Sequence, residues 1–279
     1  MRAPHRILAP GGCSLDAWLS MQRVPPDPSS SRPWARVRGL PFGAAVTVAY
    51  ICFSGVCVLF MARLFCSSVK LQLFYSAVRL DPYFSASDWS APLDDVFIHF
   101  DYARSIARGH PFEWSAGNGY SSGGTSLLYP FVLAPGFYLG FAGNRIMQFA
   151  AIVACTSVFG ALLAGRRLFR NLPWWTPFLA PPLLLSIGAL DWTLFSGMEV
   201  AFFLAVWSVV FVAWDDVVNG HPGVTADVGM KGALLLGLGN AVLVATRPEA
   251  AVVAAVFGAT AAFAVRKRRG LRAAVATFF

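Results

Sequence analysis

The sequence has little charge. Only 13% of its 279 residues are charged and 57% are hydrophobic, whereas a soluble domain is usually about 25% charged and about 45–50% apolar. Crossing the hydrocarbon of a bilayer takes roughly 20 mainly apolar residues per helix. Several such runs stand between clusters of arginine, proline and glycine. The composition therefore excludes an ordinary soluble domain and predicts an all-α, polytopic membrane protein.

Cysteine is scarce and lacks metal-ligand spacing. The five cysteines form no CxxC or Cys/His pattern, and most lie in apolar runs, where a thiol behaves as a small hydrophobic group. We expect neither a disulfide framework nor a structural zinc site. The net charge of +8 does not indicate nucleic-acid binding, because the arginines stand in short blocks beside apolar runs, as the positive-inside rule predicts.

The first 40 residues show no sustained apolar period. They are rich in arginine, proline and serine, and we expect residues 1–40 to form a disordered basic tail in the cytoplasm. The first apolar run begins only at Pro41, too late for a secretory signal, and is uncharged through Ala62. Residues 41–279 are therefore the predicted transmembrane domain, with six to seven apolar segments.

A polar interval of almost sixty residues, 67–125, follows the first apolar run. It contains six acidic and four basic residues, so its net charge is −2 and the rest of the chain carries +10. With the basic tail in the cytoplasm, one crossing places this interval outside the plasma membrane. Because a structureless loop of this length is unusual, we expect it to contain short helices.

The later apolar runs do not all fit the charge rule as crossings. If each one crossed, the basic blocks at 166–170 and 266–270 would lie outside. The two runs between 126 and 165 are interrupted by proline and glycine, and a single crossing there returns both blocks to the inside. The same choice places residues 196–199 and 246–249 outside, beside the acidic loop. The runs cover about 126–142, 146–165, 172–190, 199–214, 232–246 and 250–265.

The charge of the loop is concentrated in PLDDVFIHFDYARSIARGH, residues 92–110. Apolar side chains recur there with the spacing of one helix face: Val96, Phe100, Ala103 and Ala107. In one interpretation Asp94 caps this helix, Asp95 faces the positive end of its dipole, and Asp101 pairs with the arginines that follow it.

Two adjacent carboxylates also permit chemistry. Asp94 and Asp95 repel each other, and such a pair can share a proton or hold a divalent cation such as Mg²⁺ or Mn²⁺. A carboxylate at a helix start is stabilised in its ionised form, however, and is then a weak base. From these residues alone, the helix cap and the catalytic pair both remain open.

Three segments resemble a known family. The stretch LDDVFIHFDYARSIARGHPFEWSAGNGYSSGGTSLLYP is similar to the first outer loop of bacterial GT-C-fold glycosyltransferases, a class that includes mycobacterial-type arabinofuranosyltransferases and dolichyl-phosphate-mannose-type enzymes. FSGMEVAFF resembles their Ser-Gly-(Leu/Met)-Glu segment, and LVATRPEAAVVAA their Thr-Arg-Pro-Glu segment. The resemblance covers about residues 93–255. The loop positions that match in order are Asp94, Asp95, Phe97, Ile98, Phe100, Tyr102, Ala103, Arg104, Gly109 and His110.

The resemblance implies an inverting transfer of a sugar. The donor would be a polyprenyl-phosphate-linked sugar, and the acceptor a hydroxyl group of a cell-envelope glycan, lipid or protein at the outer face of the plasma membrane. Asp94 or Asp95 would be the general base, while its neighbour positions it or helps to bind a cation. Family members usually have further helices and an outer domain, so we expect their C-terminal part to be missing here.

Arg247 is the first candidate for binding the donor phosphate. A guanidinium can bind phosphate oxygens bidentately, and an arginine inside an apolar stretch is costly without a partner. Its alternatives are a salt bridge to Glu249 and contact with lipid headgroups. Further substrate-binding candidates are Glu249, Glu199, Arg104 and His110, although Glu199 could simply start a helix, and His99 and His110 could be structural.

Departures from the family and competing functions also follow from the sequence. Asp101 stands where family members often have Arg, and Ala250 where Gly is usual, which could alter the choice of substrate. The segment 117–126, GNGYSSGGTS, lacks the Lys of a phosphate loop and predicts a flexible turn.

Two other functions remain open from the sequence. One is a transporter or flippase-like protein, with Arg247 and Glu249 on a substrate path, and the other is a non-catalytic membrane scaffold.

Overall fold

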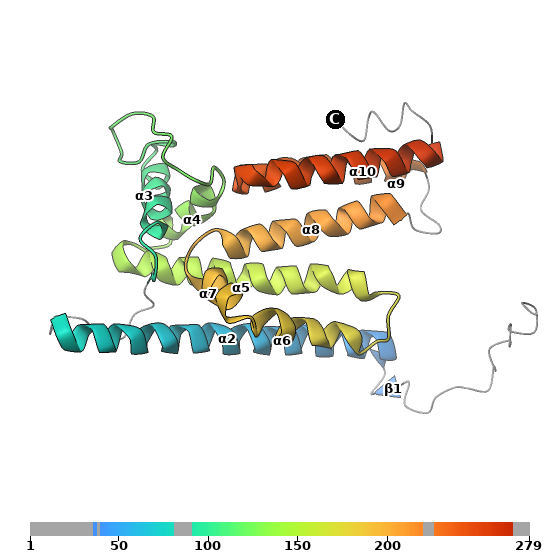
Figure 1. Cartoon of the computed structure of the whole chain (residues 1–279), viewed down its shortest axis with the longest axis horizontal. Helices are drawn as coiled ribbons and strands as arrows, with labels where there is room; N and C mark the ends of the chain where they lie inside the picture. Colours follow the sequence, from blue (N-terminus) through green and yellow to red (C-terminus); the bar gives the residue numbers. More distant parts are fainter. Residues whose placement is uncertain (1–35, 38–39, 81–90, 220–225, 270–279) are drawn as a thin grey trace, which may run out of the picture. The chain divides into compact units, whose positions relative to one another are not determined.

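The computed structural model describes residues 36–37, 40–80, 91–219 and 226–269. Clustering of contacts divides the chain into two units, residues 1–46 and 47–279. The first contains a two-residue antiparallel ladder between β1 (Arg36–Val37) and β2 (Leu40–Pro41). All regular elements among the described residues of the second unit are helices (Figure 1), as the composition predicts. Most of the predicted tail over 1–40 lies outside the described residues.

Helix α2 (Phe42–Leu80) contains the predicted first transmembrane helix. Its first part, Phe42–Ser67, has 26 residues and is long and apolar enough to cross a membrane. The helix then continues into the first residues of the predicted outer loop, because residues 68–80 contain neither glycine nor proline. It ends before Pro82, since a residue that precedes proline is disfavoured in a helix.

Helix α3 (Val96–Ala107) confirms the short helix predicted within the outer loop. The predicted apolar face is the one it buries. The helix starts one residue later than expected, with Asp95 instead of Asp94 at the N-cap, and the Asp95 side chain caps no N–H group of a described residue. The Asp94 carboxylate accepts a hydrogen bond from the Asp95 N–H, at 3.1 Å, so it binds its neighbour instead of the first turn.

The two predicted runs between residues 126 and 165 form helices α4 (Tyr129–Tyr138) and α5 (Ile146–Gly165), of which α5 alone lies in a stretch long enough to cross a membrane. Helix α4 has 10 residues, about half of what a crossing requires, and it contains a proline at its start and another inside. Helix α5 has 20 residues and belongs to an apolar stretch long enough to cross a membrane.

The predicted apolar run at 172–190 forms a bent pair of short helices. The 3-10 turn η3 (Thr176–Leu179) leads into α6 (Ala180–Leu185), and α7 (Gly188–Phe195) follows after a bend of 78°. Four prolines between 173 and 182 and the glycine that starts α7 weaken a continuous helix here.

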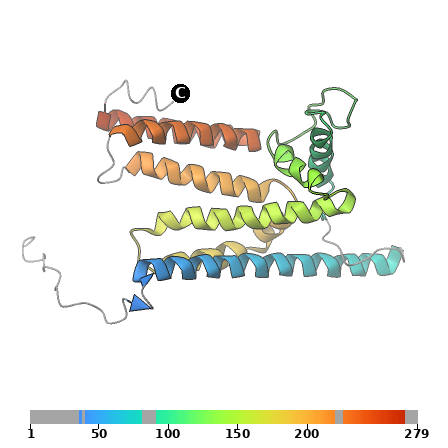
Figure 2. The ribbon, with the colours of Figure 1, turned by 180° about the vertical axis from the view of Figure 1, so that it is seen from behind.

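The remaining helices run back and forth beside α5. Helix α8 (Val200–Asn219) packs against α5, and α9 (Ala226–Thr246) and α10 (Ala251–Arg269) both pack against α8, with the 3-10 turn η4 (Pro248–Ala250) between them. Figures 1 and 2 show these long helices lying nearly parallel in successive layers. Four described helices are long and apolar enough to cross a membrane, or five spans if the bent pair α6–α7 counts as one.

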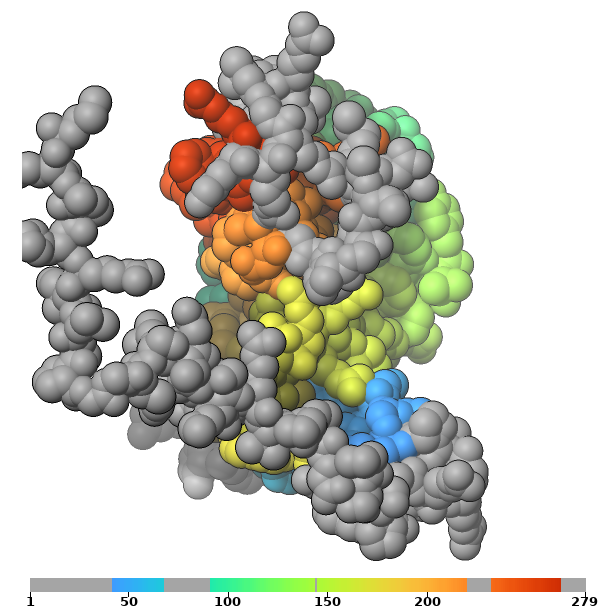
Figure 3. Space-filling view, turned by 90° about the vertical axis from the view of Figure 1, so that its right-hand side faces the viewer, coloured from blue at the N-terminus to red at the C-terminus, as the bar shows by residue number. Residues whose placement is uncertain are grey.

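The alternating helices gather their connections at two ends. We call one the basic end, because it contains Arg166, Arg167 and Arg170. There Arg166 donates a hydrogen bond to Thr47 of α2, with Nη2 and Oγ1 2.9 Å apart. Figure 3 looks at this end and shows α2 in blue, the segment after α5 in yellow and α8 in orange. The loop end, formed by residues 91–138, 196–199 and 246–250, contains α3 and α4 (Figure 1).

Candidate functional site

Three segments that are far apart in the sequence meet at the loop end. Glu199, directly before α8, lies between His99 of α3 and Arg247, which precedes η4. Its Oε2 is 3.1 Å from Nε2 of His99, and its Oε1 is 3.4 Å from Nε of Arg247. The side chains of His99 and Glu199 are each only 1% exposed. We call these three residues the His–Glu–Arg cluster.

Gly197 allows the chain to turn toward α3 at this point. Its φ of +95° lies in the left-handed region that favours glycine. A Cβ atom here would lie 2.8 Å from the Met147 side chain and 3.1 Å from Val96. The Gly197 carbonyl accepts a hydrogen bond from the buried Tyr129 hydroxyl, at 3.0 Å. The close packing of α3, α4 and α5 around one glycine thus places Glu199 in the cluster.

The end of the predicted turn 117–126 is fixed by hydrogen bonds near the start of α4 and to the segment before Arg247. The hydroxyl of Ser126 accepts a hydrogen bond from the Tyr129 N–H at the start of α4, at 3.1 Å. The N–H groups of Leu127 and Leu128 both donate to the carbonyl of Ala245, at 3.1 and 3.0 Å. Since Ala245 is two residues before Arg247, these bonds connect the outer loop to the arginine segment.

Glu199 is held as a carboxylate between two basic side chains. Burial acts to raise the pKa of Glu199, but its contacts with His99 and Arg247 outweigh burial and hold the pKa below its usual range. The His99 and Glu199 atoms lie at ion-pair distance without the direction of a hydrogen bond, and Nδ1 of His99 has no hydrogen-bond partner among the described residues. A buried carboxylate is costly unless it is paired, so the contacts with His99 and Arg247 offset the cost of burying Glu199.

Arg247 has a second carboxylate partner on its open side. Its Nη2 lies 3.3 Å from Oε1 of Glu249. Arg247 is 37% exposed and Glu249 66% exposed. The guanidinium carbon also stands 6.0 Å from the centre of the Phe203 ring. Glu199 and Phe203 therefore hold the buried side of the Arg247 guanidinium, and the side that contacts Glu249 is partly exposed to solvent.

The two adjacent aspartates lie at the edge of this cluster. Asp94 and Asp95 are exposed and precede α3 directly. Asp95 is four residues before His99, which corresponds to about 6 Å along the helix axis. Within the described part of the chain, no group of three or more His, Cys, Asp or Glu side chains could hold a metal ion. A cation on Asp94 and Asp95 would thus have only these two carboxylates, and it remains a prediction.

The structure does not bring Arg104 and His110 to the cluster. Arg104 pairs with Asp101 of the same helix, with Nη2 and Oδ1 2.8 Å apart. His110 lies beside Glu113 in the following loop, with Nδ1 and Oε2 3.3 Å apart. Trp114 donates a hydrogen bond to Asp101, at 3.2 Å. These side chains pair with one another in α3 and the loop after it, and the substrate contacts of Arg104 and His110 stay a prediction.

Two residues of the site were missed or undervalued by sequence reasoning. The sequence leaves His99 open between acceptor binding and a structural role, and it does not indicate Tyr129. A signal for His99 was available, because it stands three residues after Val96 and four before Ala103, on the buried face of α3. The ring of Tyr129 packs edge-on against His99, with ring centres 5.4 Å apart. No local pattern marks Tyr129, whose contacts all come from tertiary packing.

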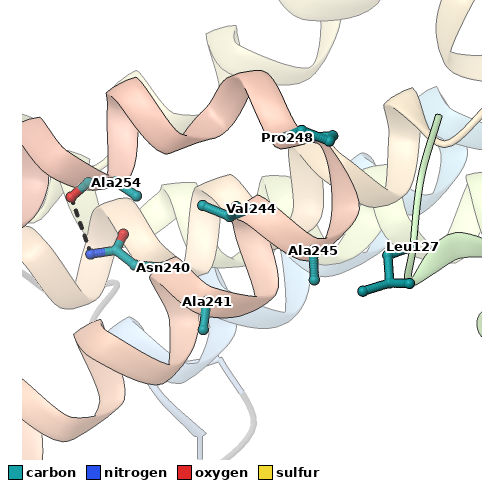
Figure 4. Close-up of a pocket in the computed structure, with 7 residues that line it drawn as sticks. All are labelled: Leu127, Asn240, Ala241, Val244, Ala245, Pro248 and Ala254. Carbon is teal, nitrogen blue, oxygen red and sulfur yellow. Dashed lines mark hydrogen bonds between the residues drawn. The ribbon is translucent and has the colours of Figure 1, made fainter.

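An apolar groove of about 590 Å³ lies between α9 and α10, beside the cluster (Figure 4). Pro248, at one end of it, directly follows Arg247 in the chain. Asn240 is the polar residue of the lining, and its Nδ2 donates to the Ala254 carbonyl, at 3.4 Å. The groove is lined by Leu127, Asn240, Ala241, Val244, Ala245, Pro248 and Ala254.

No protein-family model, curated protein or solved structure matches the chain. A function must therefore be argued from the residues of the loop end. Their chemistry combines exposed carboxylates that can accept a proton, a partly exposed guanidinium that can bind a phosphate, and an adjacent apolar groove.

Proposed function

We propose that the protein is an inverting GT-C-type membrane glycosyltransferase. It transfers a sugar from a polyprenyl-phosphate donor to a hydroxyl group of a cell-envelope glycan, lipid or protein. The observation that supports this most is the His–Glu–Arg cluster, whose contacts of 3.1 and 3.4 Å join the three segments that resemble the family. If these residues only capped separate helices, nothing would require His99 and Arg247 to lie on either side of the buried Glu199 carboxylate.

The donor binds at Arg247 in this proposal. The open edge of the guanidinium binds the phosphate, since planar N–H donors match phosphate oxygens. The apolar groove that begins at Pro248 receives part of the polyprenyl chain. Glu199 positions Arg247 from the buried side.

The transfer itself needs one base and a stabilised leaving group. Asp94 or Asp95 removes the proton of the acceptor hydroxyl, and the oxygen attacks the anomeric carbon from the face opposite the phosphate. The new carbon–oxygen bond forms as the bond to the phosphate oxygen breaks, which inverts the configuration. The leaving polyprenyl phosphate takes the electron pair, and Arg247 stabilises its negative charge.

The proposed orientation places the loop end outside the plasma membrane and the basic end in the cytoplasm. A cysteine introduced by Asp95→Cys should react with a membrane-impermeant thiol reagent added to intact cells. A cysteine introduced by Arg167→Cys should react only after the membrane is opened. Protection of position 95 in intact cells would contradict an outer active site.

A transporter or flippase-like function is the second candidate, because of the bent pair α6–α7. The 78° break between them resembles the discontinuous helices of transporters, and Asp191 of α7 is only 8% exposed. A non-catalytic scaffold is the third candidate. Only the glycosyltransferase requires Asp94 or Asp95 for a chemical step.

A transfer assay tests the proposed function. Membranes that contain the protein are given a labelled polyprenyl-phosphate sugar and an acceptor fraction, with Asp94→Asn, Asp95→Asn and the wild type compared. Loss of the general base should lower the rate about 10²- to 10⁴-fold, and the neighbouring substitution should have a smaller effect. Asp216→Asn, which changes an exposed carboxylate at the basic end, is the control and should retain transfer. Transfer that survives both substitutions would remove the catalytic assignment.

A further inference from the structure

The two carboxylates that contact Arg247 differ in how freely they can move. Glu199 and Glu249 lie at nearly equal distances from the guanidinium, 3.4 and 3.3 Å, but they are 1% and 66% exposed. Separating Glu199 would leave a buried charge without its partner, which is costly. An exposed ion pair contributes little, because water solvates both groups once they separate. Glu199 is thus a fixed partner of Arg247, and Glu249 an exchangeable one.

The exchangeable partner occupies the open edge of the arginine. Glu199 contacts Nε of Arg247, whereas Glu249 contacts Nη2. The N–H donors of Nη1 and Nη2 are those that an incoming anion would use, since the Nε side faces the buried carboxylate, and Nη2 is the one that Glu249 contacts. A second anion placed there would also stand next to the Glu249 carboxylate and be repelled by it.

We propose that Glu249 is an intramolecular competitor for the anion site of Arg247. This inference rests on the proposed function, and it adds a residue that sets how tightly the phosphate group is held. When the site is empty, the Glu249 carboxylate contacts the guanidinium. When a phosphate ester binds, the side chain rotates into solvent, which its exposed position in η4 allows.

The competition matters most for the reaction product. The donor is a phosphodiester with one negative charge, whereas the released polyprenyl phosphate is a monoester with a charge of about −1.5 to −2 at neutral pH. Arg247 therefore attracts the product more strongly than the donor. The return of Glu249 to Arg247 opposes this attraction and favours release of the product.

Binding of two matched lipids to the whole protein in lipid nanodiscs tests the inference. Farnesyl phosphate, a short phosphomonoester, reports on the anion site, and farnesol reports on the apolar contribution alone. Glu249→Gln keeps the shape of the side chain and removes its charge. It should tighten the binding of farnesyl phosphate by about two- to fivefold and leave farnesol unchanged. Asp216→Asn, which removes an exposed partner of Arg170 at the basic end, should change neither.

The outcomes separate the inference from the function on which it rests. Unchanged or weaker binding of farnesyl phosphate by Glu249→Gln overturns the inference. If the wild type nevertheless binds farnesyl phosphate more tightly than farnesol, and Arg247→Met removes this preference, the phosphate site stands and only the role of Glu249 is lost. If the wild type shows no preference for the phosphate, both proposals are wrong.

Discussion

Each end of the helical unit pairs one arginine with two acidic side chains, but the two arrangements differ in burial. At the basic end, Arg170 lies 3.1 Å from Asp215 and 3.2 Å from Asp216, and all three are partly exposed. At the loop end, Arg247 has similar distances to Glu199 and Glu249, yet Glu199 is only 1% exposed and has His99 on its other side. Similar distances thus describe an ordinary surface network at one end and a buried one at the other.

This difference in burial shows that a gain in stability alone does not explain the His–Glu–Arg cluster. Exposed ion pairs contribute about 0.2–1 kcal/mol. A buried ion pair often gives no more stability than well-packed apolar side chains of the same volume, because both charges lose their hydration. Placing Glu199 between His99 and Arg247 is useful mainly if the direction of the guanidinium matters, as it does for binding a phosphate.

The largest expected effect is a difference in stability between a substitution at the loop end and one at the basic end. Glu199→Ala should lower the free energy of unfolding by about 3–5 kcal/mol, because it leaves Arg247 and His99 without their shared partner. Asp215→Ala should cost less than about 1 kcal/mol. Denaturant unfolding in detergent micelles measures both, and equal losses would show that the buried and exposed networks do not differ.

A smaller effect is expected from one glycine at each end. Gly197→Ala should destabilise the protein by about 1–3 kcal/mol, because alanine would have to adopt the left-handed φ of +95° against Met147. Gly165 has a helical φ of −60° and open space where a Cβ atom would lie. Gly165→Ala should leave the protein unchanged or stabilise it by up to about 1 kcal/mol. A loss of stability in Gly165→Ala as large as in Gly197→Ala would contradict this account.

The smallest effect appears as a dependence on pH. The pKa of Glu199 is lower in the folded protein than its usual value. The stabilisation that the ionised Glu199 side chain gives the folded protein is therefore fully present above the usual glutamate pKa of about 4.3. That contribution is lost as the pH falls through the lowered pKa. The difference in unfolding free energy between wild type and Glu199→Gln should narrow as the pH is lowered from 7 toward 3. A difference that stays constant over this range would argue against an ionised Glu199.

Features set by composition and charge were predictable from the sequence. The apolar runs predict the helices, and the positive-inside rule selects one crossing between 126 and 165 and brings Glu199 and Arg247 to the same end. This succeeded because charge and length act on whole segments. The short helix at Val96–Ala107 also follows from its apolar period.

Features set by tertiary packing were not predictable. The bend between α6 and α7 depends on how a proline-rich run packs, and run length alone gives a straight helix. The positions of Arg104 and His110 depend on the fold of the loop, which shows no period. Placing His99 in the cluster requires the approach of Gly197 to Val96, which no local pattern encodes. The separation of Asp94 and Asp95 into base and helper likewise remains a matter for the transfer assay.

The most direct test of the central claim asks which arginine binds phosphate, since both ends contain arginines. Binding of a labelled polyprenyl phosphate is measured for the wild type, Arg247→Met and Arg170→Met in nanodiscs, with Arg247→Lys as a variant that keeps the charge beside Glu199. The account predicts that Arg247→Met binds at least about tenfold more weakly, as expected for loss of a charge-assisted contact, and that Arg170→Met binds like the wild type. Wild-type affinity in Arg247→Met, or an equal loss in Arg170→Met, would contradict it.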